Sequence, residues 1–382
     1  MSTSSANAIN LRRHAGRDAV TGHSSTTVGA RIGLALAIAV SGMATLGQAA
    51  APSTTADPAA PPAPREEPRT AGTVAVPAGG VRHELGFVLC RIPAGTFTMG
   101  SRPGEPGHRD NESPAHAVTI SQDFMLSATE VTIGQFQAFV DATGYVTDAE
   151  RDAAGGFGFD WSTGEIAQVH GLDFRDPGFP DWVPGPDHPA ILLTWNDAEA
   201  FCRWLSSRDG QTYRLPTEAE WERAARGGTE SPWWFGASAT GRANVADAAL
   251  RSAVPAMRET ADWHDGHAFL APVASYPANP YGLHDVHGNV WEWCADVHDD
   301  TAYIARETVP DRPTVDPTGP SAGAFRVIRG GGWLNPPAAT RAAQRVYFRP
   351  TFRYCLLSGF RVAMDVPPVT EARASADEPA GP

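Results

Sequence analysis

Apolar residues recur at helical spacing in only a few short segments of this chain, which constrains it to a fold built largely of loops. One helix is predicted over residues 132–142, with Thr132 as its N-cap. A second should begin at Asn196, whose side chain can accept hydrogen bonds from the first free amides. A third should begin at Thr217, because Glu220 completes a capping box with it.

The other patterned segments predict short strands. Alternation over residues 88–99 is interrupted by Pro93 and Gly95, which indicates two strands joined at a turn. Residues 116–126 predict another pair of strands. Residues 144–189 have little periodicity but many aromatic residues and glycines, so we expect a long loop packed over one face. The pattern therefore predicts a fold that is low in regular secondary structure.

The first residues indicate where the protein works. An apolar run at residues 32–46 follows several arginines and precedes small residues at a plausible cleavage site, so residues 1–49 are predicted to be an export signal. The run is shorter than the roughly 20 residues that a membrane-spanning helix needs. We therefore expect an extracytoplasmic protein, periplasmic or secreted. An uncleaved N-terminal anchor, which would be its one membrane contact, is the alternative.

Two further segments are predicted to be disordered. Residues 50–80 are rich in proline and alanine and have almost nothing bulky and apolar to bury, so they should form an extended linker. Residues 367–382 should form a frayed tail. A folded domain is therefore predicted over residues 81–366, which is near the upper limit for one hydrophobic core.

All 30 basic residues are arginine, because the chain contains no lysine. Schiff-base chemistry, a lysine general base and a phosphate-binding P-loop lysine are therefore excluded. The formal net charge of −13 repels nucleic acid and anionic lipid surfaces. We therefore expect no nucleic-acid partner.

The cysteines, Cys90, Cys202, Cys294 and Cys355, are far apart in the sequence. In an exported protein four cysteines permit two disulfides, and the three possible pairings stay open. No two of them have the C-x-x-C spacing of a redox or zinc motif.

Several blocks occur in an order that resembles a known family. They are I-P-A-G-T-F-T-M-G (92–100), E-V-T-I-G-Q-F-Q-A-F-V-D-A-T-G-Y (130–145), H-P-A-I-L-L-T-W-N-D-A-E-A-F-C-R-W-L (188–205), R-L-P-T-E-A-E-W-E-R-A-A-R-G-G (214–228), G-L-H-D-V-H-G-N-V-W-E-W (282–293), R-V-I-R-G-G-G-W (326–333) and G-F-R-V-A (359–363). The series resembles the sulfatase-modifying factor, or formylglycine-generating enzyme, family. The resemblance implies a C-type-lectin-like α+β fold with low regular secondary structure.

The resemblance also implies a chemistry whose ligands are missing here. In the family, copper(I) held by two thiolates uses molecular oxygen to oxidise a sulfatase cysteine to formylglycine. The family's active-site serine and two cysteines correspond to Gly332, Asn335 and Thr340. Amide and hydroxyl oxygens are hard, poor partners for copper(I). We therefore expect no two-cysteine copper mechanism, and the catalytic residues are unknown. Relatives act in ergothioneine synthesis with a non-haem iron or in pyoverdine maturation, so iron stays an alternative.

Calcium is a second cofactor that the resemblance implies. One site would use the positions of Asn244, Val245, Asp265 and His267, and another those of Asp285, Gly288, Val290 and Glu292. Side-chain oxygens combined with backbone carbonyls suit calcium. The alternative for the second segment is a simple tight turn between buried tryptophans.

Two pairs of histidines share an H-x-x-H spacing, His264 with His267 and His284 with His287. They could hold a transition metal such as iron, zinc or copper. The alternative is that they lie at the surface or only support neighbouring groups.

Arginines recur every four residues after the glycine run, at Arg341, Arg345, Arg349 and Arg353. They could donate hydrogen bonds to loop carbonyls. Alternatively, they could line a pocket for an acidic or peptide ligand.

Two classes of function follow from these observations. The first is an exported, oxygen- and metal-dependent oxidase or maturation factor that acts on a peptide, protein or small molecule. The second is a non-catalytic, calcium-stabilised, lectin-like domain that binds a ligand where the copper site would be. A bound transition metal would support the first class, and calcium alone would support the second.

Overall fold

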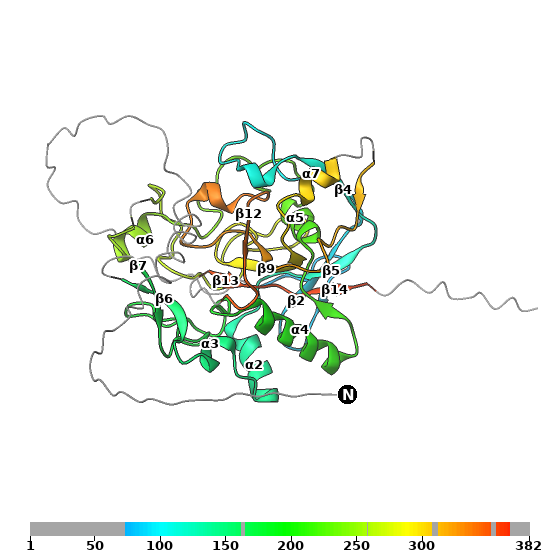
Figure 1. Cartoon of the computed structure of the whole chain (residues 1–382). Coiled ribbons are helices and arrows are strands. Elements are labelled where there is room, and N and C mark those ends of the chain that lie inside the picture. Colours follow the sequence, from blue (N-terminus) through cyan, green and yellow to red (C-terminus); the bar gives the residue numbers. More distant parts are fainter. Residues whose placement is uncertain (1–72, 162–164, 258, 308–311, 353–356, 367–382) are drawn as a thin grey trace, which may run out of the picture. The chain divides into compact units, whose positions relative to one another are not determined.

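The computed structural model of the chain describes residues 73–366, except 162–164, 258, 308–311 and 353–356 (Figure 1). The predicted export signal and the predicted C-terminal tail lie outside these residues. Val74 packs against the hydrophobic core. The folded part therefore begins before Val81, within the stretch that was predicted to be a linker.

The helices of the described residues are short. They are α2 (Ile133–Thr143), α3 (Asp148–Arg151), α4 (Trp195–Asp209), α5 (Glu218–Arg226), α6 (Ala248–Ala253), α7 (Ala302–Glu307) and the 3-10 helices η1 (Asp110–Glu112) and η2 (Pro337–Thr340). Within this part of the chain, none of them is long and apolar enough to cross a membrane.

Two of the three predicted helix starts are confirmed, because Thr132 and Thr217 each form a capping box. The predicted cap of α4 is wrong, since Thr194 rather than Asn196 is the N-cap. The Thr194 hydroxyl accepts a hydrogen bond from the Asp197 amide at 3.1 Å, and the Asp197 carboxylate accepts one from the Thr194 amide at 2.9 Å. This reciprocal pair satisfies the amides of Thr194 and Asp197, which is the pattern of a capping box.

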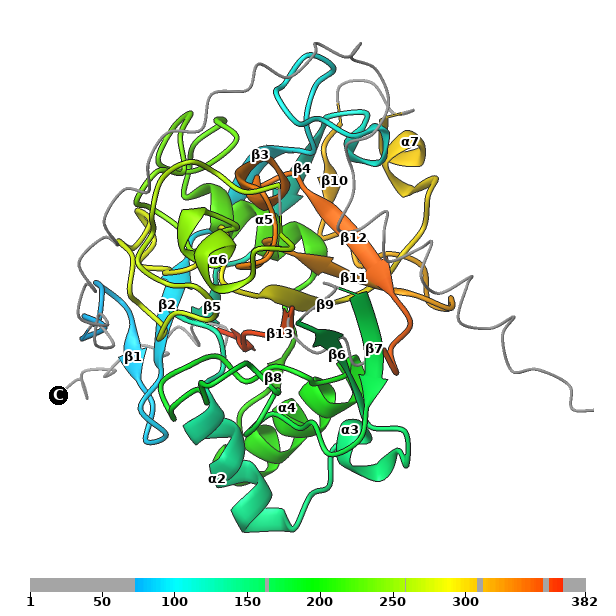
Figure 2. The same cartoon turned by 90° about the vertical axis from the view of Figure 1, so that its left-hand side faces the viewer.

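The strands form small sheets (Figure 2). A five-stranded sheet has the order β1-β2-β5-β14-β8, a three-stranded sheet the order β10-β4-β3, and a four-stranded sheet the order β12-β11-β9-β13, while β6 pairs with β7. Their bounds are β1 (Val81–Arg82), β2 (Val88–Ile92), β3 (Gly95–Met99), β4 (His116–Ile120), β5 (Phe124–Ser127), β6 (Gly156–Asp160), β7 (Glu165–Val169), β8 (Tyr213–Arg214), β9 (Trp291–Val297), β10 (Thr314–Val315), β11 (Arg326–Arg329), β12 (Arg345–Phe348), β13 (Ser358–Gly359) and β14 (Ala363–Asp365).

The predicted strands are confirmed as β2 and β3 in the first segment and β4 and β5 in the second, with β2 hydrogen-bonded to β5 and β3 to β4. The long segment 144–189 is not the structureless loop that was expected, since it contains α3 and the antiparallel hairpin of β6 and β7. In β6, Phe157 and Phe159 alternate with glycines at 156 and 158, and glycines at these positions are as typical of a loop as of a strand.

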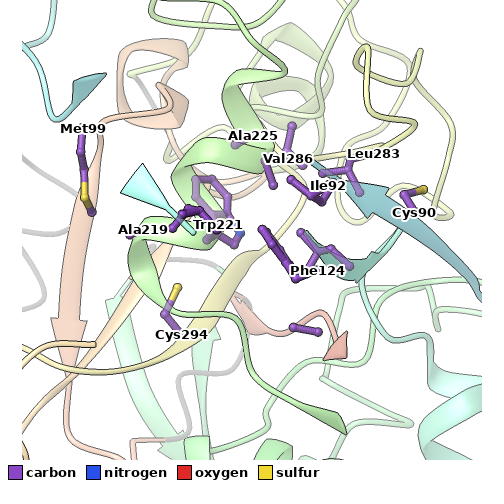
Figure 3. Packing of buried hydrophobic residues seen from close by; sticks show 14 of the residues in the cluster. Cys90, Ile92, Met99, Phe124, Ala219, Trp221, Ala225, Leu283, Val286 and Cys294 are labelled. Carbon is purple, nitrogen blue, oxygen red and sulfur yellow. The ribbon is translucent and has the colours of Figure 1, made fainter. Parts of the chain in front are cut away.

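The core lies around α5, and every residue of that helix is buried. In both views α5 lies on one side of β9 and β13, and α2 and α4 lie on the other (Figures 1 and 2). Figure 3 shows Trp221 of α5 in one cluster with Ile92, Phe124 and Val286, which come from β2, β5 and the segment before β9. A helix with this many charged residues can be buried only if each charge is paired.

Candidate functional site

The segment that would carry the copper ligands begins where β11 ends in three glycines. Gly330 and Gly331 have φ angles of 97° and 76°, in the left-handed region that favours glycine. A Cβ atom on Gly331 would lie 2.7 Å from the Cγ2 atom of Thr340 and 2.8 Å from the carbonyl oxygen of Ala339. The glycine therefore lets the chain turn tightly against η2, which brings positions 332 to 340 into one compact loop.

Asn335 and Thr340 are both buried, and hydrogen bonds occupy their side chains. The Trp291 indole donates to Asn335 Oδ1 at 2.7 Å, and the Gly332 amide donates to the same atom at 3.0 Å. The Trp233 indole donates to Thr340 Oγ1 at 3.1 Å. Each side chain thus takes part in the packing of the loop, and neither offers the sulfur that copper(I) prefers.

Aromatic rings cover this loop. The ring centroid of buried Trp333 lies 5.6 Å from those of Phe179 and Phe269, and Trp182 packs on both of these phenylalanines. Phe179 and Trp182 belong to the segment 144–189, so the expectation that this segment packs over one face is confirmed. Trp182 is only partly buried, which leaves an aromatic edge at the surface beside the loop.

The histidines next to the loop are occupied in hydrogen bonds. His287 Nε2 accepts a hydrogen bond from the Trp234 amide at 3.2 Å, so its Nδ1–H donates to the Thr340 carbonyl at 2.8 Å. Burial lowers the pKa of His287 to about 3, which keeps the ring neutral. His284 lies 2.7 Å from the Tyr276 carbonyl through Nδ1. Within the described ranges no three His, Cys, Asp or Glu side chains converge on a metal, so the histidine hypothesis gains no support.

The first predicted calcium site contains a buried oxygen with no hydrogen-bond partner, Asn244 Oδ1. The other end of the same amide is fully used. Asn244 Nδ2 donates to the Phe269 carbonyl at 2.8 Å and to Asn289 Oδ1 at 3.0 Å. The amide orientation therefore leaves its oxygen for a cation, because a buried carbonyl oxygen without any partner is costly.

Asp265 brings the other residues of this site together. Its carboxylate accepts the amide hydrogens of Val245 at 2.8 Å and of His267 at 2.9 Å. Burial and, next, the negative charge of Asp247 raise the pKa of Asp265 to about 8. A calcium ion would offset both effects, since it stabilises the ionised carboxylate. Asp265 thus contacts Val245 and His267, Val245 follows Asn244 directly, and the oxygen atoms of these residues are of the kind that calcium takes, so the site stays a prediction.

The second predicted site has the same signature at Asp285. Asp285 Oδ2 accepts a hydrogen bond from the Ala274 amide at 2.7 Å, whereas its Oδ1 is buried without a partner. Burial is the main cause that raises the pKa of Asp285 to about 6. Gly288 and Val290 lie in the buried turn that leads into β9, and the Gly288 amide donates to the Gly330 carbonyl at 2.9 Å. This turn is therefore tied to the glycine run.

Hydrogen bonds within the protein occupy the carboxylate of Glu292, the fourth residue predicted for this site. Arg361 donates to both of its oxygens, at 2.6 and 2.7 Å, and the Trp221 indole donates to one of them at 2.6 Å. Three hydrogen bonds, two of them from a fully buried guanidinium, bind the carboxylate to its neighbours. Glu292 therefore serves as an ion-pair partner in the core, and its predicted role as a calcium ligand stays a prediction.

Glu130, which sequence reasoning missed, has the free carboxylate oxygen instead. It is fully buried, its Oε1 accepts a hydrogen bond from Asn289 Nδ2 at 3.1 Å, and its Oε2 has no partner. Burial and, next, the charge of Asp285 raise its pKa. The signal in the sequence was one acidic residue inside a largely apolar stretch, residues 124–133. Together with Asp285 it offers hard oxygen ligands of the kind calcium takes.

The arginines after the glycine run have structural partners. Arg341 forms ion pairs with Glu105 and Glu112, and Arg345 pairs with Glu218 of α5 at 2.7 Å. Arg341 and Arg345 are buried, so they do not line an open pocket. Arg349 lies over the ring of Phe325, and Arg353 lies outside the described residues.

The cysteines Cys90, Cys202 and Cys294 are free and buried, and Cys355 lies outside the described residues. Burial raises the pKa of Cys90 to about 11 and raises the pKa values of Cys202 and Cys294 further. These thiols are therefore poor nucleophiles and poor metal ligands at neutral pH.

This chain is similar in sequence to proteins of one known family. Residues 63–366 match the family model of the sulfatase-modifying factor enzyme 1-like domain. The formylglycine-generating enzyme of Streptomyces coelicolor is 40% identical over 68% of this chain and 82% of its own length. The inactive C-alpha-formylglycine-generating enzyme 2 of Mus musculus is 30% identical over 66% of this chain and 76% of its own length.

Solved structures show the same architecture. The structure of PvdO from Pseudomonas aeruginosa is 30% identical, with a TM-score of 0.59 over 78% of this chain and 100% of that chain. The fold is therefore the C-type-lectin-like α+β fold of formylglycine-generating enzymes, with few helices and short strands. This chain belongs to the sulfatase-modifying factor, or formylglycine-generating enzyme, family.

Proposed function

We propose that this protein is an exported maturation factor or oxidase that acts with molecular oxygen on a peptide or small molecule, without a copper centre held by two thiolates. The main support for the lack of that copper centre is that Asn335 and Thr340 occupy its ligand positions. Both side chains are buried, and each is hydrogen-bonded to a tryptophan indole. Membership of the family supports the oxidase class. The mouse relative named as inactive supports the idea that members exist without the founding activity.

Calcium is the proposed structural cofactor. Asn244 Oδ1, the Asp265 carboxylate and the backbone of Val245 and His267 would hold one ion. Asp285 Oδ1, Glu130 Oε2 and the carbonyl groups of Gly288 and Val290 would hold the other. Bound calcium supplies positive charge that neutralises buried carboxylates and fixes the loops, and it supplies no redox chemistry. The buried oxygens without hydrogen-bond partners support this assignment.

The first test measures calcium, copper and iron by elemental mass spectrometry on the exported protein after loading with each metal and dialysis. We expect calcium to stay bound and copper to be lost. Stoichiometric copper in the native protein would overturn the proposal. Iron that survives dialysis would identify the metal of the oxidase, and calcium alone without any oxygen uptake would favour a ligand-binding domain.

A paired substitution tests the positions themselves. The variant N335C/T340C restores two thiols where the family has them, and N335S/T340S is the matched control with oxygen in place of sulfur. We expect the cysteine variant to bind copper(I) and the serine variant to bind none, because copper(I) selects thiolates. Equal copper content in the two variants would show that the loop does not bring positions 335 and 340 within reach of one ion.

Export is tested separately. A reporter enzyme that is active only outside the cytoplasm is fused after residues 1–49, and the control fusion carries an arginine in the middle of the apolar run, at Ala37. Activity of the first fusion and not of the second supports an export signal. If both fusions stay in the cytoplasm, residues 1–49 are not an export signal.

A further inference from the structure

The side chain of Asn289 lies between the two proposed calcium sites. It is fully buried, and its Oδ1 atom accepts hydrogen bonds from Asn244 Nδ2 and from the Ala271 amide, both at 3.0 Å. Its Nδ2 atom donates to Glu130 Oε1 at 3.1 Å and to the Ala271 carbonyl at 3.3 Å. One amide therefore contacts a proposed ligand of each site.

These contacts allow only one orientation of the Asn289 amide. If the oxygen and nitrogen exchanged places, an amide oxygen would face the Glu130 carboxylate and an amide nitrogen would face Asn244 Nδ2. Like groups would then meet at both ends, each without a hydrogen-bond partner inside the protein. The main chain adds rigidity, because the Asn289 amide donates to the Asn244 carbonyl at 2.9 Å.

Asn244 and Glu130 each use one atom for Asn289 and leave a different atom without a partner. The free atoms are Asn244 Oδ1 and Glu130 Oε2. A cation on either free oxygen would hold that side chain in the position that serves Asn289. Asn289 would in turn hold the side chain at the opposite end, since buried hydrogen-bond chains reinforce one another.

We propose that Asn289 couples the two calcium sites, so that calcium bound at one site raises the affinity of the other. This inference rests on the calcium sites of the proposed function. Asn289 acts as a positioning residue, because it touches ligands of both ions and its own oxygen is used within the protein. Coupling of this kind is reciprocal, and it typically changes affinity about fivefold or more.

The test is a cycle of substitutions measured by calorimetric titration of the full-length protein with calcium. Asp265→Asn disables the first site without removing the Asn244–Asn289 hydrogen bond. In the protein that keeps Asn289 we expect it to raise the Kd of the second site about fivefold or more. In the Asn289→Ala background we expect the same substitution to leave that Kd unchanged.

Asn279 is the matched control. It is also buried, and its side chain also makes four hydrogen bonds, to Ala224, Ala225, Tyr281 and Leu283, none of which is a proposed calcium ligand. Asn279→Ala should lower stability and leave the coupling intact. If it abolished the coupling as Asn289→Ala does, the effect would be general loosening and the proposal would be wrong.

A second measurement covers the case in which Asn289→Ala does not fold. Asp285→Asn disables the second site, and by reciprocity it should weaken the first site by the factor that Asp265→Asn imposes on the second. Calcium binding with no such effect in either direction overturns the coupling and leaves the sites standing. A native protein that binds no calcium overturns the sites themselves.

Discussion

Arg361 and Glu292 form a two-point ion pair in the core, with both side chains fully buried and 69 positions apart in the sequence. Arg361 also donates to the carbonyls of Ser127 and His284, and Glu292 also accepts the Trp221 indole. The pair therefore joins β9, α5 and the segment before β14. It occupies the carboxylate that the sequence assigned to the second proposed calcium site.

Removing the arginine of this pair should be strongly destabilising. Arg361→Met leaves Glu292 charged and buried with one indole as its remaining side-chain partner, which costs about 3–5 kcal/mol of unfolding free energy. Urea unfolding measures the change as a lower midpoint at an unchanged slope. The matched control is Arg203→Met, which breaks the exposed pair with Glu199 and should change stability by less than about 0.5 kcal/mol. Equal losses in both variants would contradict the buried pair.

Substitution of Glu130 should weaken calcium binding, whereas substitution of Glu292 should mainly lower the stability of the fold. Glu130→Gln removes a proposed ligand charge, so we expect the Kd of the second calcium site to rise about tenfold or more. Glu292→Gln should lower the unfolding midpoint and leave that Kd nearly unchanged, because Arg361 and Trp221 occupy its carboxylate. Calorimetric titration of both variants decides the point, and a larger calcium effect for Glu292→Gln would restore the original motif assignment.

His287 should stay neutral from about pH 4 to about pH 8, because burial holds its pKa at about 3 and both ring nitrogens are hydrogen-bonded. The unfolded chain binds a proton at a pKa of 6.5, so His287 costs stability as pH falls below that value and costs nothing above it. Proton NMR of the ring should show no titration in the native protein and ordinary titration in urea. A native midpoint near 6.5 would show that the ring is not enclosed.

The three buried thiols should resist alkylation. In native protein at about pH 8, iodoacetamide should leave Cys90, Cys202 and Cys294 unmodified, because burial raises their pKa values and removes the reactive thiolate. In urea all three should react, which serves as the control. Peptide mass mapping gives the answer residue by residue, and rapid native labelling of any of the three would contradict its burial.

Much of the local structure was readable from the sequence. The capping boxes at Thr132 and Thr217 and the existence of the strands before α2 depend on residues within a few positions of each other, so spacing alone predicts them. The residues of the first calcium motif also lie together as the motif implies, since Asp265 binds the backbone of both Val245 and His267.

The β6–β7 hairpin and the cap of α4 were missed for local reasons. The glycines that alternate with phenylalanines in β6 are also typical of a loop, and Thr194 competes with Asn196 for the free amides at the start of α4. The local signal for the cap of α4 is the Thr194-x-x-Asp197 spacing of a capping box.

By itself, the sequence determined that this chain has no lysine chemistry and that oxygen side chains stand where the family has copper thiolates, and through the family resemblance it predicted which loops would hold calcium. Only the tertiary structure decided which buried carboxylate forms an ion pair and which keeps an oxygen without a hydrogen-bond partner. Glu292 turns to Arg361, and Glu130 leaves an oxygen free beside Asn289. The physical reason is that spacing governs hydrogen bonds between near neighbours, whereas the pairing of buried charges depends on groups that only folding brings together.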